Sequence, residues 1–123
     1  MIKHIDEVMA ISDQIKHASC SEAKSINPQD ALFVDVRSKE AFNAGHIPNA
    51  VHCERGLLEF LVADGSPMQL NIFNQQSHQH CIVYCNGGRQ SVLAAKTLQD
   101  MGVKGVKNLL GGYAEWVATE SDK

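Results

Sequence analysis

The sequence lacks the features that mark membrane, secreted and nucleic-acid-binding proteins. It contains no apolar run near the roughly 18 residues of a membrane span. Its first residues, MIKHIDEVMA, lack the apolar run of a secretory signal. Acidic side chains outnumber basic ones by 14 to 11, giving a formal net charge of −3, whereas binding to a phosphate backbone requires a basic surface. These absences predict a cytoplasmic protein with neither a membrane nor a nucleic-acid partner.

Cysteine is also scarce, with four residues in the chain: Cys20, Cys53, Cys81 and Cys85. Three residues separate Cys81 from Cys85, and no His or Cys pair elsewhere supplies the spacing of a tetrahedral zinc site. Nothing else marks a small disulfide-stapled scaffold. We therefore expect reduced thiols and no metal site, with Cys20, Cys53 and Cys81 serving as packing residues.

Helical and strand patterns alternate along the chain, whose 123 residues are 44% hydrophobic and 20% charged, as in a single globular domain. Apolar residues at helical spacing predict helices, and short β-branched runs predict strands. The predicted helices cover 2–15, 21–27, 39–44, 57–62, 91–101 and 113–119, and the predicted strands cover 31–37, 50–53, 81–85 and 106–110. This alternation predicts an α/β fold, a mainly parallel sheet with helices on both faces. The polar stretch 64–79 is expected to be a surface excursion.

The segment CNGGRQS, residues 85–91, is the strongest functional signal. Cys85 ends a predicted buried strand, at the edge where parallel sheets bind ligands. Glycines let successive backbone N–H groups converge, and the N-terminus of the following helix adds positive potential. An ordinary cysteine is only about 3% thiolate at pH 7, but such surroundings lower the pKa of a thiol to roughly 3.5 to 7.5. We therefore expect Cys85 to be a nucleophile inside an anion cradle. The cradle residues are Asn86, Gly87, Gly88, Arg89, Gln90 and Ser91.

A cysteine surrounded by amide donors suits an oxyanion that carries a labile atom: thiosulfate, a persulfide, phosphate or arsenate. A protease-type cysteine would need a positioned histidine, and the sequence does not show which of the six histidines approaches Cys85. The structural alternative is a buried cysteine at a strand end beside a glycine turn.

Three segments resemble the rhodanese family of sulfurtransferases in its single-domain form. DVRSKEAFNAGHIPNA at 35–50 is similar to the family's DVR, acidic-aromatic and GHI pattern. YCNGGRQSVLAAKTLQDMG at 84–102 is similar to its cysteine loop and following helix, and LLGGYAEW at 109–116 to its closing glycine pair and tryptophan. The resemblance covers about residues 16–120. It implies a rhodanese-like domain at 16–120, so the amphipathic pattern before it predicts an N-terminal helix packed on the domain at 1–15, and 121–123 is expected to be a tail.

The resemblance implies a thiosulfate sulfurtransferase. Cys85 would accept a sulfane sulfur from thiosulfate or another persulfide donor, form a persulfide, and pass the sulfur to cyanide or a thiol, including that of a sulfur-accepting protein. The cradle amides would hold the transferred sulfur, and neither a metal nor an organic cofactor is required.

The chain departs from the family pattern C-x-x-G-x-R-S at one place. Arginine is expected five positions after the cysteine, but Arg89 lies four after it and Gln90 occupies the fifth. Either Arg89 turns toward the anion, or it points to solvent and the backbone amides alone bind the sulfur. Arg55, just after a predicted strand end, is a candidate for recruiting a dianionic donor. Cys53 would resolve the persulfide as a disulfide if it lay close to the cradle.

Other residues of these segments are expected to be structural. Asp35 would hydrogen-bond to nearby backbone, His46 would tie a loop, and Trp116 would anchor the last helix. Arg37 would pair with Glu40, and the alternative is that Arg37 helps to attract anions.

Two rival functions remain at this point. A phosphatase or arsenate reductase of the related fold commonly carries HC-x5-R, whereas Tyr84 replaces the histidine here and the spacing from Cys85 to Arg89 is shorter. A non-catalytic module that carries or binds sulfur is the other rival.

Overall fold

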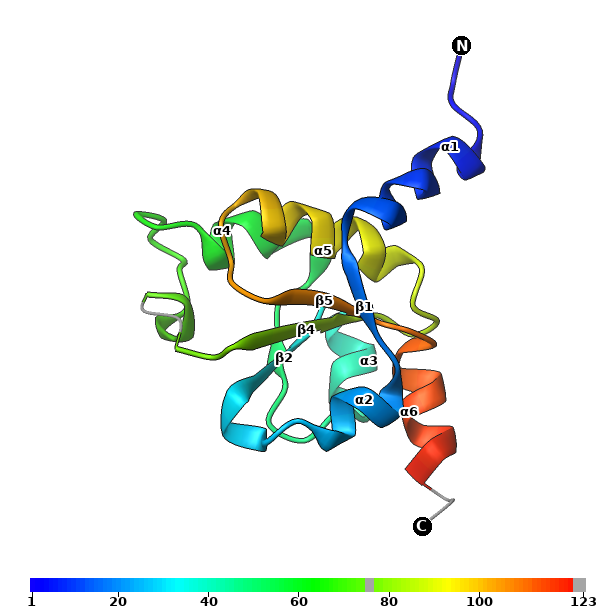
Figure 1. Cartoon of the computed structure of the whole chain (residues 1–123). Helices are drawn as coiled ribbons and strands as arrows, with labels where there is room; N and C mark the ends of the chain where they lie inside the picture. The colour runs from blue at the N-terminus through cyan, green and yellow to red at the C-terminus, as the bar shows by residue number, and fades with distance from the viewer. Residues whose placement is uncertain (75–76, 121–123) are drawn as a thin grey trace.

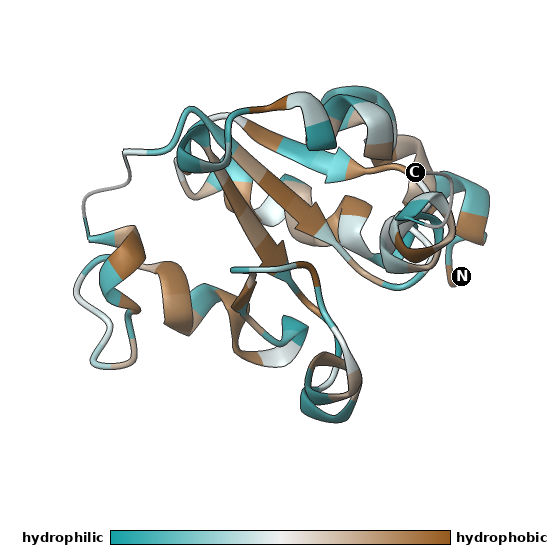
Figure 2. Cartoon of the chain, turned by 90° about the horizontal axis from the view of Figure 1, so that it is seen from below, coloured by the Kyte–Doolittle hydropathy of each residue, from teal (hydrophilic) through white to brown (hydrophobic). Residues whose placement is uncertain are grey.

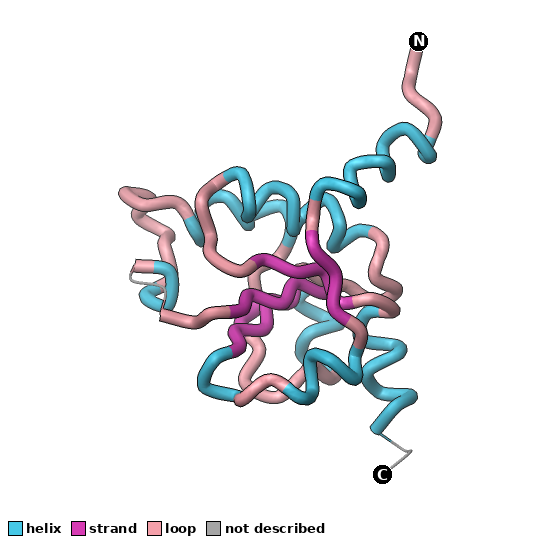
Figure 3. The backbone as a smooth tube through the Cα atoms, viewed as in Figure 1, coloured by secondary structure: helices cyan, strands magenta, loops and turns pink. Residues whose placement is uncertain are grey.

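The computed structural model describes residues 1–74 and 77–120, so the predicted tail at 121–123 lies outside the described residues. Five parallel strands form one sheet in the order β1-β5-β4-β2-β3 (Figure 3). The strands are β1 (Lys16–Ala18), β2 (Ala31–Asp35), β3 (Val51–His52), β4 (His80–Tyr84) and β5 (Val106–Leu109). The structure therefore confirms the α/β class and the parallel sheet.

Helices cover both faces of this sheet (Figure 1). On one face lie α4 (Leu58–Val62) and α5 (Gln90–Asp100), and on the other lie α2 (Cys20–Ser25), α3 (Lys39–Ala44) and α6 (Gly112–Glu120). The short α1 (Ile5–Met9) and four 3-10 turns complete the described elements: η1 (Ala10–Gln14), η2 (Pro28–Asp30), η3 (Arg55–Leu57) and η4 (Asn71–Phe73).

The alternation of side chains along β4 divides the core into two apolar clusters, because successive residues of a strand face opposite sides. Cys81 and Val83 pack in the cluster that includes Ala94 and Leu98 of α5. Ile82 and Tyr84 pack in the other cluster, with Trp116 of α6. The central strands carry mostly hydrophobic residues, as Figure 2 shows. A strand buried on both faces needs such a continuous apolar run.

The N-terminal segment differs from the single helix predicted over 2–15. A capping box, with His4 accepting from the N–H of Asp6 and Glu7 accepting from the N–H of His4, starts α1 at Ile5. The helix then tightens into η1, which packs against α5, and Ile15 is buried. Ile2 and Ile5 remain exposed because their side of the segment meets no other element.

The sequence analysis did not predict β1, because its three residues are too few to show an alternation of polar and apolar side chains. It pairs with β5 in the register His17 to Asn108. Among the described residues, no helix combines the length and apolar character needed to cross a membrane.

Candidate active site

Cys85 directly follows β4 at the carboxyl edge of the sheet, and its side chain is buried, with the residue 3% exposed. The N–H of Gly88 donates to its Sγ over 3.2 Å, and the N–H of Ser91 does so over 3.3 Å. The Ser91 Oγ lies 3.3 Å from the same sulfur. Ser91 is the second residue of α5, whose N-cap residue Arg89 makes no side-chain cap hydrogen bond. The Cys85 sulfur therefore accepts a hydrogen bond from a helix N–H that would otherwise need a capping side chain as its acceptor.

Two glycine conformations shape this loop. Gly88 has φ +88°, and a Cβ there would lie 2.9 Å from the Gly111 nitrogen and 3.1 Å from the Leu109 oxygen. Gly112 has φ +62°, and a Cβ there would lie 2.5 Å from the Cys85 oxygen. Only glycine fits both positions, so the loop and the start of α6 pack backbone against backbone.

Hydrogen bonds fasten the same contact. The N–H of Tyr113 donates to the Cys85 carbonyl over 2.9 Å, and the N–H of Ala114 donates to the Asn86 carbonyl over 3.0 Å. The first turn of α6 thus fixes the backbone on the outer side of the loop.

The environment of Cys85 favours the thiolate. Burial by itself raises the pKa of this thiol, but hydrogen bonds from the Ser91 hydroxyl and from the N–H groups of Ser91, Gly88 and Gly87 outweigh burial and lower it below its ordinary value. Cys53 and Cys81 lack such donors, and burial raises the pKa of each to about 12. At neutral pH these two thiols are protonated, and Cys85 is the thiol that its surroundings prepare for nucleophilic attack.

Asn108 is a buried polar residue beside this site that the sequence analysis did not single out. It is 1% exposed on β5. Its Oδ1 accepts from the Ser91 hydroxyl over 2.5 Å, and its Nδ2 donates to the Gly88 carbonyl over 3.1 Å. Nδ2 also lies 3.3 Å from His17 Nδ1 on β1. The sequence did offer a signal for Asn108: it lies two residues after the buried Val106, so both face the same side of the strand. A polar side chain at such a position needs a hydrogen-bond partner.

The remaining candidate residues lie at the rim or outside the loop. The side chains of Asn86, Arg89 and Gln90 are exposed. Arg55, in η3, forms an ion pair with Glu59 over 3.1 Å and donates to Thr97 Oγ1 on α5 over 3.2 Å.

The predicted pairing of Arg37 with Glu40 is wrong. Arg37 pairs with the fully buried Asp35 over 2.7 Å and also donates to the Gly45 carbonyl over 2.7 Å. Its guanidinium lies 4.4 Å from the ring centroid of Tyr113. Asp35 also accepts from the Arg37 N–H, which confirms its expected bond to backbone. The Arg37 guanidinium faces Asp35 and the Gly45 carbonyl, whereas Glu40 is exposed.

Two further structural expectations are confirmed. His46 Nδ1 lies 2.8 Å from the Phe42 carbonyl and ties the loop after α3. Trp116 is buried and packs edge-on against Phe33 of β2, with ring centroids 5.4 Å apart, which anchors α6.

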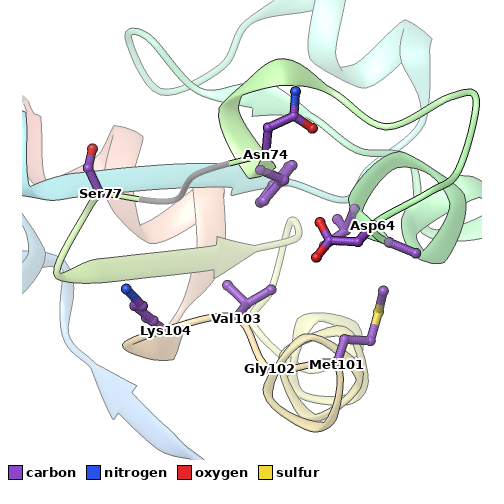
Figure 4. Close-up of a pocket in the computed structure, with 10 residues that line it drawn as sticks. Asp64, Asn74, Ser77, Met101, Gly102, Val103 and Lys104 are labelled. Atoms are coloured by element: carbon purple, nitrogen blue, oxygen red, sulfur yellow. The ribbon is translucent and has the colours of Figure 1, made fainter.

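A separate open pocket of about 840 Å³ lies at the amino ends of the strands, away from Cys85 (Figure 4). Asp64, Asn74 and Ser77 line it on one side, and Met101 and Lys104 line it on the other. Because β4 and β5 run from this edge toward the carboxyl edge, the pocket takes no part in the cysteine site. Among residues 1–74 and 77–120, no group of three or more His, Cys, Asp or Glu side chains could hold a metal ion.

Comparison with known proteins identifies the family. Residues 19–119 match the Rhodanese-like domain. The chain belongs to this family. The rhodanese-like match begins directly after β1 and covers the other four strands, the Cys85 loop and α6 up to Thr119.

Three similar proteins show the range of relatives that this rhodanese-like domain has. The thiosulfate sulfurtransferase GlpE of Pseudomonas savastanoi pv. phaseolicola is 27% identical over 89% of this chain and 94% of its own length. The tRNA uridine(34) hydroxylase of Hamiltonella defensa is 30% identical over 80% of this chain, which spans only 26% of that protein. A Rhodopseudomonas palustris structure, described as of unknown function and a possible tyrosine phosphatase, is 31% identical, with a TM-score of 0.87 over 98% of this chain and 93% of its own.

Proposed function

We propose that this rhodanese-like protein is a sulfurtransferase that moves a sulfane sulfur from thiosulfate or another persulfide donor to cyanide or a thiol acceptor. Cys85 is the nucleophile, and residues 86–91 form the cradle for the transferred sulfur. The observation that carries the proposal is the convergence of the Gly88 and Ser91 N–H groups on the Cys85 sulfur, at 3.2 and 3.3 Å. These donors favour an anionic sulfur at a strand end where a small donor would bind.

The reaction divides into two displacements. In the first, the Cys85 thiolate attacks the outer sulfur of thiosulfate, a sulfur–sulfur bond forms on Cys85, and sulfite leaves with the electron pair of the broken bond. In the second, cyanide or a thiolate attacks the outer sulfur of the persulfide and takes it away, and Cys85 returns as a thiolate. Charge balances in each step, so no oxidant, metal or organic cofactor is needed.

The loop residues support both steps by holding negative charge. N–H groups that point inward stabilise the thiolate before the attack and the charged sulfur after it. Arg55 would act only at long range, by attracting the dianionic donor, since its guanidinium bonds to Glu59 and Thr97 rather than to the loop. The buried Cys53 would stay out of the reaction, because a thiol with a pKa of about 12 is protonated at neutral pH.

The similarity to GlpE supports this function, because the chain spans nearly all of that thiosulfate sulfurtransferase. The match to the tRNA uridine(34) hydroxylase covers about a quarter of the relative, so that activity is not part of the proposal.

The test is thiosulfate-dependent conversion of cyanide to thiocyanate, together with the mass of the protein after thiosulfate alone. We expect turnover with ping-pong kinetics and a protein heavier by one sulfur atom. Cys85→Ser should abolish both, whereas Cys20→Ala, a buried thiol outside the loop, should retain both. Absence of both turnover and the added sulfur in the unmodified protein would refute the proposal.

A phosphatase is the second candidate, because the R. palustris relative is described as a possible tyrosine phosphatase. Against it stand the exposed side chain of Arg89 and a loop in which arginine follows the cysteine by only four positions. A phosphatase stabilises the three equatorial oxygens of the transferred phosphoryl group, which needs positive charge inside the loop. Release of phosphate from an aryl phosphate without any thiocyanate formation would favour the phosphatase. A stable added sulfur with no turnover would instead favour a sulfur carrier.

A further inference from the structure

A chain of buried polar groups connects Cys85 to the edge strand β1. It runs from the sulfur to Ser91, then to Asn108 on β5, and then to His17 on β1, whose Nε2 lies 3.0 Å from the Ser12 carbonyl oxygen. Ser91 and Asn108 are 0% and 1% exposed, so their polar groups hydrogen-bond within the protein rather than to solvent, and His17 is half-buried.

The hydrogen-bond partners assign every proton in this chain. The Ser12 carbonyl can only accept, so Nε2 of His17 carries the ring proton and Nδ1 is an acceptor. Nδ1 therefore receives one proton of the Asn108 amide nitrogen, and the Gly88 carbonyl receives the other. The amide oxygen then faces Ser91 and takes the hydroxyl proton. When Cys85 is a thiol, its S–H donates to Ser91 Oγ, and every donor has a partner.

Ionisation of Cys85 changes this arrangement. The sulfur then needs donors, and Ser91 has a single hydroxyl proton, which Asn108 Oδ1 already accepts. The hydroxyl reaches the sulfur as a donor only by turning away from Asn108. The Asn108 amide oxygen and the thiolate are therefore competing acceptors for one proton.

We propose that Asn108 is a positioning residue for Cys85: its amide holds the Gly88 carbonyl in place, and its oxygen competes with the Cys85 sulfur for the hydroxyl proton of Ser91. The proposal rests on the sulfurtransferase function for its role in turnover. Asn108 would restrain the ionisation of the resting thiol while keeping the Gly88 N–H aimed at the sulfur.

Charged groups on the packed elements face away from this network. Lys96 of α5 pairs with Asp100 over 2.7 Å near the end of the helix, and Lys107 of β5 lies 3.0 Å from His80 Nδ1. Asp13 of η1 and Arg89 are exposed. Within residues 1–74 and 77–120, His17 and Cys85 are therefore the titratable groups that the network joins.

A double-mutant cycle on the ionisation of Cys85 tests the proposal, with ultraviolet thiolate absorbance read against pH. Asn108→Leu has a similar volume and no acceptor, so it should free the Ser91 hydroxyl and raise the acid dissociation constant of Cys85 about tenfold. In a Ser91→Ala background the same substitution should not raise this constant, because no hydroxyl is left to free, and any fall that remains there reports the lost contact with the Gly88 carbonyl. The matched control Asn43→Leu, at an exposed asparagine of α3, should have no effect. An unchanged dissociation constant in Asn108→Leu, or an equal change in both backgrounds, would overturn the proposal.

The unmodified protein supplies a second measurement, which does not depend on the folding of a variant. The side-chain amide resonances of Asn108 should show a shift with the same midpoint as Cys85 ionisation, and that shift should be absent in Cys85→Ala. Resonances that do not respond to Cys85 would contradict the competition. Neither measurement requires sulfur transfer, so a failed cycle with normal thiocyanate formation rejects the role of Asn108 alone. A successful cycle without turnover rejects the sulfurtransferase alone.

Discussion

At the scale of single residues, four cysteines with the same side chain have different chemistry because their hydrogen-bond donors differ. Cys53 and Cys81 are sealed in the apolar cluster, and burial raises their pKa values. Cys85 belongs to the same cluster, but the donors on α5 and its preceding loop lower its pKa. Depth of burial alone therefore does not decide which thiol reacts.

Ser91→Ala should raise the pKa of Cys85, because the largest stabilising donor to the thiolate is the Ser91 hydroxyl. One hydrogen bond to a charged group is worth about 1.5 to 3 kcal/mol, or roughly one to two pKa units. The rising limb of the pH profile for thiosulfate turnover should therefore move to higher pH. A profile that keeps its midpoint while the maximum rate falls would contradict this origin of the pKa.

At the scale of elements, the glycines of the loop have unequal roles that substitution can separate. Gly88→Ala should lower the free energy of unfolding by about 1 to 3 kcal/mol and impair sulfur transfer, because its φ is +88° and its Cβ would press on the Gly111 backbone. Gly87→Ala should change stability by no more than about 0.5 kcal/mol, since nothing lies within 4 Å of the added Cβ and the N–H is retained. Denaturant unfolding of both variants checks this, and equal losses would show that loop packing is not the cause.

The sequence predicts the elements well where a local pattern determines them. The helix predicted over 91–101 corresponds to α5, whose Ser91, Ala94, Ala95 and Leu98 are buried. The helix predicted over 39–44 has the same bounds as α3. The sequence also predicts correctly that Cys85 lies at the end of a strand, because a β-branched run followed by glycines is a local signal.

What local pattern cannot supply is pairing between distant segments. The three-residue β1 exists through its register with β5, and Asn108 meets Ser91 only when β5 lies beside β4. The partner of Arg37 depends on how the chain turns after β2, so choosing Glu40 from charge alone was wrong.

At the scale of the whole molecule, the buried thiols make stability depend on alkaline pH. In the unfolded chain Cys53 and Cys81 ionise near 9.0, and in the folded chain each does so only at about 12. The unfolded state therefore binds fewer protons in this range, and stability falls as pH rises from about 9 toward 12, by about 1.4 kcal/mol per pH unit for each thiol. Cys81→Ala should make this decline shallower, as measured by urea unfolding at several alkaline pH values. An unchanged slope would mean that other groups cause the decline.

The packing of α6 on the cysteine loop also determines when, during protein synthesis, the surroundings of the Cys85 thiol are complete. Tyr113 and Ala114 hold the carbonyls of Cys85 and Asn86, and Asn108 holds Gly88. During synthesis on the ribosome, Cys85 leaves the exit tunnel before residues 108–114 do. Until residues 108–114 have also left the tunnel, these contacts are missing and the geometry around the Cys85 sulfur is incomplete.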